Sequence, residues 1–168
     1  MAKNKGRAWT FGANISTDLI FPGRYVEFLS DNDKLRSITL IDAREDFAPN
    51  VQAGDFVVAD DNFGMGSSRE QAALMMRLCN VSAVVAKSFA RIFFRNCINN
   101  GVPAIELDTS NISDGDELEI HLAEGKLVNH TKGETYEFPP LPQIMTDILD
   151  EGGLVSYIKQ HGDFAVGG

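Results

Sequence analysis

A short segment rich in glycine and serine carries the residue types best suited to chemistry in this chain. It reads GMGSSRE over residues 64–70 and follows an apolar run that predicts a strand. The residues after it favour a helix, and at such a junction the free backbone N–H groups and the helix dipole both attract an anion. Two hydroxyl groups, the guanidinium of Arg69 and two glycines therefore predict a compact site for a carboxylate or phosphate.

The same segment also fits a purely structural role. Ser67 and Glu70 have the S-x-x-E spacing of a capping box, which closes the start of a helix whether or not a ligand binds. Arg69 argues against that interpretation, because a cation in the first turn opposes the helix dipole by up to about 1 kcal/mol, and a bound anion would reverse this effect. The residue order matches neither the Walker loop nor G-x-G-x-x-G, which argues against a mononucleotide site.

Two further segments combine small polar and charged residues. KSFAR at residues 87–91 stands between the next predicted strand and helix. Ser88 is either the N-cap of that helix, with Arg91 in solvent, or a second part of the same site. The segment Ser-Thr-Asp at residues 16–18 fits an Asx or ST turn, and its role also stays open at this point.

The spacing of the histidines and cysteines excludes several kinds of site. His121, His130 and His161 are far from the serine pair in the sequence and have polar neighbours, so we expect surface positions and no Ser-His-Asp triad. Cys79 and Cys97 each lie in an apolar helical pattern and give neither a disulfide framework nor metal-ligand spacing. We therefore expect no metal site in this chain.

The composition predicts one folded domain over residues 1–168. Of these residues 43% are apolar, and no repeat or low-complexity linker divides the chain. The net charge of −9 argues against binding to nucleic acid or to an anionic membrane surface. No apolar segment is long enough for a leader or a membrane span, which together with the free thiols predicts a cytoplasmic protein.

Strands and helices alternate through the first two thirds of the chain. The patterns predict strands at 6–11, 55–60, 81–86 and 102–107, helices at 67–80 and 88–100, and a loop or short helix at 19–33. This order is typical of parallel strands joined by right-handed crossovers, and Phe93 and Phe94 should belong to the core.

The last third has a different pattern. Residues 116–138 alternate over short runs and predict antiparallel strands, and residues 141–162 predict two short helices separated by Gly152-Gly153. The predicted fold class is therefore α/β, with a mixed sheet and flanking helices.

The sequence resembles the aconitase family, and within it the small subunits of 3-isopropylmalate dehydratases. The resemblance depends on Ser-Thr-Asp at 16–18, GDFVVADDNFGMGSSREQAA at 54–73, AKSFARIFFRNCINNG at 86–101, and the order of these segments in a short chain. It extends over most of residues 8–107, and the later residues match only in general character. It implies a swivelling β/β/α domain.

The resemblance also implies site residues and a partner. In that family the first serine of the Ser-Ser-Arg run is the base that removes and returns a proton on substrate carbon, and this serine corresponds to Ser67. Ser68 and Arg69 would bind substrate carboxylate, and Thr17 and Asp18 match active-site positions on a neighbouring loop. A large partner subunit would hold a 4Fe-4S cluster whose open iron takes the substrate hydroxyl. This chain would bind no cofactor itself and would be inactive alone.

The loop after Pro22-Gly23 is expected to influence substrate choice. In related small subunits this loop discriminates among 3-isopropylmalate, homocitrate and similar acids, and Arg24 is a further candidate for substrate binding. The specificity positions here are Tyr25, Val26, Glu27 and Phe28. Val26 and Phe28 favour an apolar substituent, whereas an inward-facing Glu27 would repel a third carboxylate.

The resemblance, carried by these residues, implies the small subunit of a hydro-lyase. Its reaction would interconvert 2-isopropylmalate and 3-isopropylmalate by dehydration and rehydration in leucine biosynthesis, with a small di- or tricarboxylate as ligand. The alternatives are a related hydro-lyase of the citramalate, dimethylmalate or homoaconitate type, and a non-catalytic anion-binding module. Formation of a homo-oligomer by the isolated chain also stays open.

Overall fold

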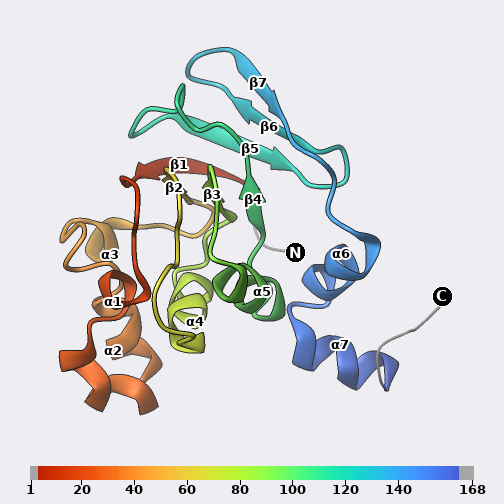
Figure 1. Ribbon diagram of the computed structural model, residues 1–168. Helices are drawn as coiled ribbons and strands as arrows, with labels where there is room; N and C mark the ends of the chain where they lie inside the picture. Colours follow the sequence, from red (N-terminus) through yellow and green to blue (C-terminus); the bar gives the residue numbers. More distant parts are fainter. Residues whose placement is uncertain (1–3, 163–168) are drawn as a thin grey trace.

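A seven-stranded mixed sheet forms the centre of the structure, a computed structural model that describes residues 4–162 (Figure 1). Its strands are β1 (Lys5–Thr10), β2 (Phe56–Ala59), β3 (Ala83–Ala86), β4 (Ala104–Glu106), β5 (Glu117–His121), β6 (Lys126–Asn129) and β7 (Glu134–Glu137). Its helices are α1 (Thr17–Ile20), the 3₁₀ helix η1 (Gly23–Ser30), α2 (Asn32–Ser37), α3 (Phe47–Asn50), α4 (Glu70–Leu78), α5 (Arg91–Asn99), α6 (Gln143–Asp150) and α7 (Leu154–His161).

Strand β1 joins two differently paired halves of the sheet, whose order is β4-β3-β2-β1-β5-β6-β7. Its C-terminal half pairs in parallel with β2, with Ala8 opposite Phe56, and β3 and β4 continue the parallel arrangement. Its N-terminal half pairs antiparallel with β5, with Arg7 opposite Glu117, and β6 and β7 follow as antiparallel strands. The predicted mixed sheet with flanking helices is thus confirmed.

Alternate residues of the parallel strands belong to two apolar layers. Val57 and Val84 join the layer that includes buried residues of α4 and α5, whereas Phe56 and Val85 join the layer that includes buried residues of β5 and β6. Figure 1 shows α1 to α5 gathered on one side of the molecule and β5 to β7 curled over the opposite side. Burial on both faces explains why these strands are continuous apolar runs.

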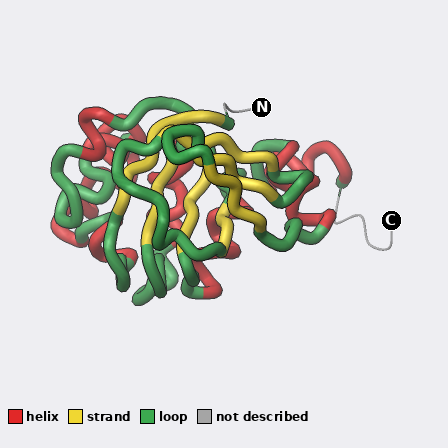
Figure 2. Tube along the Cα trace, turned by 90° about the horizontal axis from the view of Figure 1, so that it is seen from above, coloured by secondary structure: helices red, strands yellow, loops and turns green. Residues whose placement is uncertain are grey.

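The C-terminal helices lie at one side of the molecule, far from α1 to α3. Seen from above (Figure 2), the strands cross the middle and these helices stand beside one end of the sheet. Ile148 of α6 and Tyr157 of α7 pack against Ile98 of α5. The turn between α6 and α7 contains Gly152 and Gly153, both at positive φ, as the predicted break between two short helices requires.

Two helices begin later than the sequence predicts. α4 begins at Glu70 instead of residue 67, and α5 begins at Arg91 instead of residue 88. Arg69 and Ala90, which directly precede these helices, are extended, and the loops before them pair with neighbouring loops, as in the bridge between Phe63 and Phe89. The region 19–33 contains η1 and the start of α2, and α3 lies outside the predicted elements. Among the predicted core residues, Phe93 is buried but Phe94 is only half-buried.

Candidate active site

Two loops that leave the carboxyl ends of β1 and β2 are joined by backbone hydrogen bonds. The N–H of Gly64 donates to the carbonyl of Ile15 at 2.7 Å, and the N–H of Thr17 donates to the carbonyl of Met65 at 2.8 Å. Ser16 and Met65 also form a parallel bridge, so the pairing of the two strands continues past their ends. This pairing places the predicted residues of the first loop beside the Ser-Ser-Arg run of the second.

The hydroxyl groups of Ser67 and Thr17 are in contact. Their oxygens lie 3.1 Å apart, and the Thr17 hydroxyl also lies 3.3 Å from the carbonyl oxygen of Ser67. Thr17 is buried at 1% exposure at the start of α1, which Ser16 caps by accepting from the N–H of Leu19. Ser67 itself is exposed. A fixed hydroxyl that can donate to Ser67 Oγ would stabilise negative charge on that oxygen.

Arg69 turns back from the start of α4 onto the loop around α1. Its Nη1 lies 3.4 Å from Oδ1 of Asp18 and donates to the carbonyl of Phe21 at 3.2 Å. The side chain of Arg69 is 36% exposed and that of Asp18 is 70% exposed, so this ion pair stands at the surface. A guanidinium has five N–H donors. Both contacts of Arg69 use Nη1, so its remaining donors can still form a bidentate pair with a carboxylate.

The structure therefore brings together four of the predicted site residues, from two loops: Thr17, Asp18, Ser67 and Arg69. Ser68 is exposed between Ser67 and Arg69. The arrangement offers hydroxyl groups and a guanidinium around one open surface, which suits binding of a small carboxylate and a proton transfer at Ser67.

The alternative in which Ser67 and Ser88 cap helix starts is not seen in the structure. Arg69 is the N-cap residue of α4 and Ala90 that of α5, and neither helix start in the described structure has a side-chain cap. Since α4 begins at Glu70, the spacing of a capping box with Ser67 is lost. The hydroxyl of Ser88 instead accepts from the backbone N–H of Asn62 at 2.8 Å, in the neighbouring loop.

Arg24 is held by a carboxylate that the sequence did not reveal. Its Nη1 and Nη2 donate to the two oxygens of Asp42 at 2.7 and 2.6 Å, and its guanidinium stacks on Tyr25. The hydrogen bonds from Arg24 lower the pKa of Asp42 and raise that of the guanidinium. No local pattern marks Asp42, because the pairing depends on how the chain returns after α2.

The predicted specificity positions lie in η1, which contributes no buried residue to the core. Tyr25 and Phe28 are half-buried and their ring centroids lie 5.3 Å apart. Val26 is 59% exposed and Glu27 is also exposed. The contact between η1 and the site passes through Gly23, where an added Cβ would lie 3.7 Å from the Arg69 guanidinium. Whether these residues select substrate stays a prediction.

The loop between β3 and α5, which contains KSFAR, packs against the loop that carries Ser67. The N–H of Phe63 donates to the carbonyl of Ser88, and the N–H of Ala90 donates to the carbonyl of Phe63, both at 3.0 Å. Gly64 has a φ of +81° and lies so close to Phe93 that an added Cβ would be 2.2 Å from its ring. The second junction is therefore a support for the Ser67 loop, and Arg91 is exposed.

The histidines lie at the surface as predicted. His130 and His121 lie 2.8 and 3.5 Å from the carboxylate of Glu119, and the hydrogen bond with His130 lowers the pKa of that carboxyl group. His161 lies 3.6 Å from Glu151 on the last two helices. None of these contacts involves the loop cluster around Ser67.

The cysteines do not offer a metal site. Cys79 and Cys97 are buried, and burial raises the pKa of both thiols, which keeps them protonated. Residues 4–162 contain no group of three or more His, Cys, Asp or Glu side chains placed to hold a metal ion. The described residues therefore do not fit an iron-sulfur cluster.

None of the helices within residues 4–162 has the length and apolar character to cross a bilayer.

The fold and the loop cluster define a known class of protein domain. Residues 11–110 match the family model described as the aconitase C-terminal domain. This range begins just after β1 and includes η1, α4, α5 and all the loops that form the candidate site.

Relatives that match over nearly their whole length place the chain in a narrower group within this family. The chain is 53% identical over 164 residues to 3-isopropylmalate dehydratase small subunit 2 of Archaeoglobus fulgidus, covering 98% of this chain and 99% of that protein. It is 53% identical over 161 residues to 3-isopropylmalate dehydratase small subunit 1 of Thermotoga maritima, covering 95% and 97%.

A solved structure agrees with these sequence relatives. A crystal structure of 3-isopropylmalate dehydratase from Methanocaldococcus jannaschii superposes with a TM-score of 0.90 at 43% identity, covering 95% of each chain. The chain therefore belongs to the family of 3-isopropylmalate dehydratase small subunits, within the wider aconitase family.

Proposed function

We propose that this chain is the small subunit of a hydro-lyase that interconverts 2-isopropylmalate and 3-isopropylmalate by dehydration and rehydration, in leucine biosynthesis in the cytoplasm. Relatives named for this activity are about half identical to the chain over nearly its whole length. The single observation that supports a catalytic site here is the contact of Ser67 with Thr17 beside the Arg69–Asp18 pair.

Ser67 would be the base that removes the proton from substrate carbon and returns it in the second half of the reaction. An ordinary serine is a weak base, so the site must stabilise its alkoxide form. Thr17 lies 3.1 Å from Ser67 Oγ and can donate to it, and no side chain caps the nearby start of α4 in the described chain. Both the donated bond and the helix N-terminus favour negative charge at this position.

Arg69 and Ser68 would bind substrate carboxylate. The guanidinium is held at Nη1 by Asp18 and by the carbonyl of Phe21, which fixes its plane before substrate arrives. Asp18 would act mainly by orienting Arg69. Arg24 would take a second acidic group only by exchanging its partner, since Asp42 occupies both of its terminal nitrogens.

A large partner subunit would complete the site. The exposed loop cluster and the adjoining apolar residues of η1, with Val26 at 59% and Leu29 at 43% exposure, suit a surface that a second protein covers. The partner would hold a 4Fe-4S cluster, which would supply a Lewis-acidic iron for the substrate hydroxyl. The roles given to this chain are proton transfer, carboxylate binding and orientation.

The residues of η1 favour a substrate that carries an apolar substituent. Val26, which is 59% exposed on η1, would contact the isopropyl group, while the exposed Glu27 would disfavour a third carboxylate. The test is a panel of 3-isopropylmalate, citramalate, dimethylmalate and homocitrate on the reconstituted enzyme. The proposal requires the highest kcat/KM for 3-isopropylmalate.

The base is tested by Ser67→Ala in the complex with the cluster-bearing large subunit. Loss of a positioned acid-base group should lower kcat by about 10²- to 10⁴-fold. Ser110→Ala is the control, because this exposed serine hydrogen-bonds to Asp108 outside the loop cluster and its loss should leave kcat close to wild type. Undiminished turnover by Ser67→Ala would exclude Ser67 as the base. Tight binding of 3-isopropylmalate to the isolated chain without turnover in any complex would favour an anion-binding module instead.

A further inference from the structure

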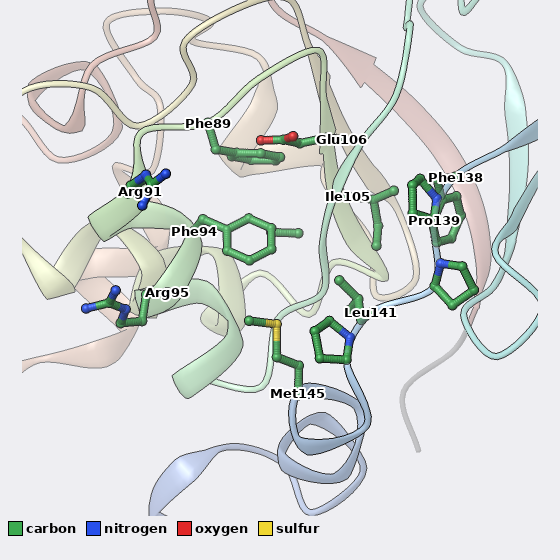
Figure 3. Close-up of a pocket in the computed structure, with 13 residues that line it drawn as sticks. Phe89, Arg91, Phe94, Arg95, Ile105, Glu106, Phe138, Pro139, Leu141 and Met145 are labelled. Atoms are coloured by element: carbon green, nitrogen blue, oxygen red, sulfur yellow. The ribbon is translucent and has the colours of Figure 1, made fainter.

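A cavity lies between α5, β4 and the segment that leads into α6. Its volume is about 480 Å³, which falls within the range of small-molecule sites. Figure 3 shows its walls, in which Phe94, Ile105, Leu141 and Met145 surround the open space. None of the residues assigned to the candidate active site lines this cavity, so it is a separate place on the molecule.

One wall of the cavity is conformationally stiff. The segment from Phe138 to Pro142 reads FPPLP, and all five residues line the space. Proline fixes its own φ and restricts the residue before it, so this wall has little freedom to collapse into the cavity. A preformed cavity loses less conformational entropy when a ligand binds.

Two opposite charges stand at one end of this apolar space. Glu106, at the end of β4, and Arg91, the first residue of α5, lie on either side of the ring of Phe89 (Figure 3). Both are exposed, and the ion pairs and side-chain hydrogen bonds of residues 4–162 include neither of them. Arg91 also places a cation at the start of a helix, which is unfavourable unless an anion is near. Arg95 lines the cavity too, but its guanidinium points away from the apolar wall (Figure 3).

We propose that this cavity binds a free α-amino acid with a large apolar side chain. The ammonium group would pair with Glu106, the carboxylate with Arg91, and the side chain would lie among Phe94, Ile105 and Met145. A simple carboxylate would leave Glu106 without a partner, and a simple amine would leave Arg91 without one. A ligand with both an ammonium group and a carboxylate can therefore pair with Glu106 and with Arg91 at once. This inference goes beyond the proposed function and does not rest on it.

Binding is measured by titration calorimetry of L-leucine into the full chain. Three probes each lack one recognised part: 4-methylpentanoate lacks the ammonium group, 3-methylbutylamine lacks the carboxylate, and L-alanine lacks the large apolar side chain. L-Leucine should bind with one site per chain. Each probe should bind about ten- to a hundredfold more weakly, the factor expected when a charged hydrogen bond or a buried side chain is lost.

Variants test whether the heat measured in the L-leucine titration comes from binding in this cavity. Glu106→Gln and Arg91→Gln should each weaken L-leucine binding by about ten- to a hundredfold. Arg95→Gln is the matched control, since it removes the same charge from the same helix one turn away and should leave the affinity unchanged. Ser67→Ala should also bind L-leucine normally, which separates this site from the candidate active site. The urea midpoint of each variant shows that it is folded.

Three results would overturn the proposal. One is the absence of L-leucine binding at millimolar concentration to the wild-type chain. Another is an equal loss of affinity in Arg95→Gln and Arg91→Gln, which would indicate a general effect of helix charge. The third is loss of binding in Ser67→Ala, which would place the amino acid in the candidate active site.

Discussion

The packing of Gly64 against Phe93 gives a quantitative test of how the Ser67 loop is held. Gly64 has a φ of +81°, and a Cβ at this position would lie 2.2 Å from the Phe93 ring. Ordinary carbon contacts begin near 3.5 Å, so the ring would have to move by more than about 1 Å. Phe93 is 2% exposed and packs against Phe63 and Phe89, which leaves the ring little room to move.

Two terms add up in Gly64→Ala. The left-handed backbone conformation costs an alanine about 1–2 kcal/mol, and overpacking of a buried site costs about 1–3 kcal/mol. The reduced entropy of the unfolded chain returns about 0.4–1 kcal/mol. The free energy of unfolding should therefore fall by about 1–5 kcal/mol. The assay is urea unfolding followed by circular dichroism, with the slope m checked for a constant value.

Gly66→Ala separates the two terms. Gly66 has a φ of +101°, but the nearest atom to an added Cβ is the hydroxyl oxygen of Thr17 at 3.5 Å, an ordinary contact. Gly66→Ala should show the backbone term alone, so Gly64→Ala should be more destabilised by about 1–3 kcal/mol. Equal losses in the two variants would refute the argument that Phe93 supports the loop by direct contact. In the reconstituted enzyme, both variants should also lower kcat because they displace Ser67.

Three further predictions concern the rest of the domain. Asp55 is buried at 7% exposure and accepts three hydrogen bonds, so Asp55→Ala should lower the free energy of unfolding by about 3 kcal/mol, measured in urea. Hydrogen bonds from Arg44 lower the pKa of Asp114 to about 2, so the unfolded chain takes up this proton first and stability should fall as the pH drops from about 4 toward 2. Asp114→Asn should flatten that part of the urea midpoint against pH. Cys79 and Cys97 are buried with raised thiol pKa values, so a thiol reagent should label neither in the native chain and both in urea. Rapid labelling of the native chain, or an unchanged pH profile in Asp114→Asn, would contradict these expectations.

Much of the sheet could be predicted from the sequence because its strands are short apolar runs between recognisable turns. All residues of the parallel strands β2 and β3 are buried, and the valine pairs in these strands separate them clearly from the helices. The antiparallel strands alternate between buried and more exposed residues, as β5 does, and this pattern is also visible in the sequence. Local patterns sufficed because each of these elements follows its own periodicity.

The helix starts were predicted less well, for a physical reason. Ser67 and Ser88 have the composition of N-caps, but both loops gain more by pairing with their neighbours than by starting a helix early. Ser67 contacts Thr17, which is far away in the sequence, and no local rule for helix capping includes such a partner. The pairing of Arg24 with Asp42 is non-local in the same way.

The position of Arg69 has a consequence for the isolated chain. An arginine that both opposes its helix dipole and pairs with a 70% exposed aspartate gains little stability from either contact. The Ser67 loop is also held open toward solvent, although the core directly behind it is tightly packed at Gly64. A binding site benefits from a rigid loop and from a cation whose present partners contribute little stability. The loop then loses little conformational entropy when a ligand binds, and the cation can pair with that ligand. Replacement of Arg69 by Gln should therefore leave the urea midpoint of the isolated chain nearly unchanged while raising KM in the reconstituted enzyme. A large loss of stability in Arg69→Gln would mean that this arginine serves the fold and not a ligand.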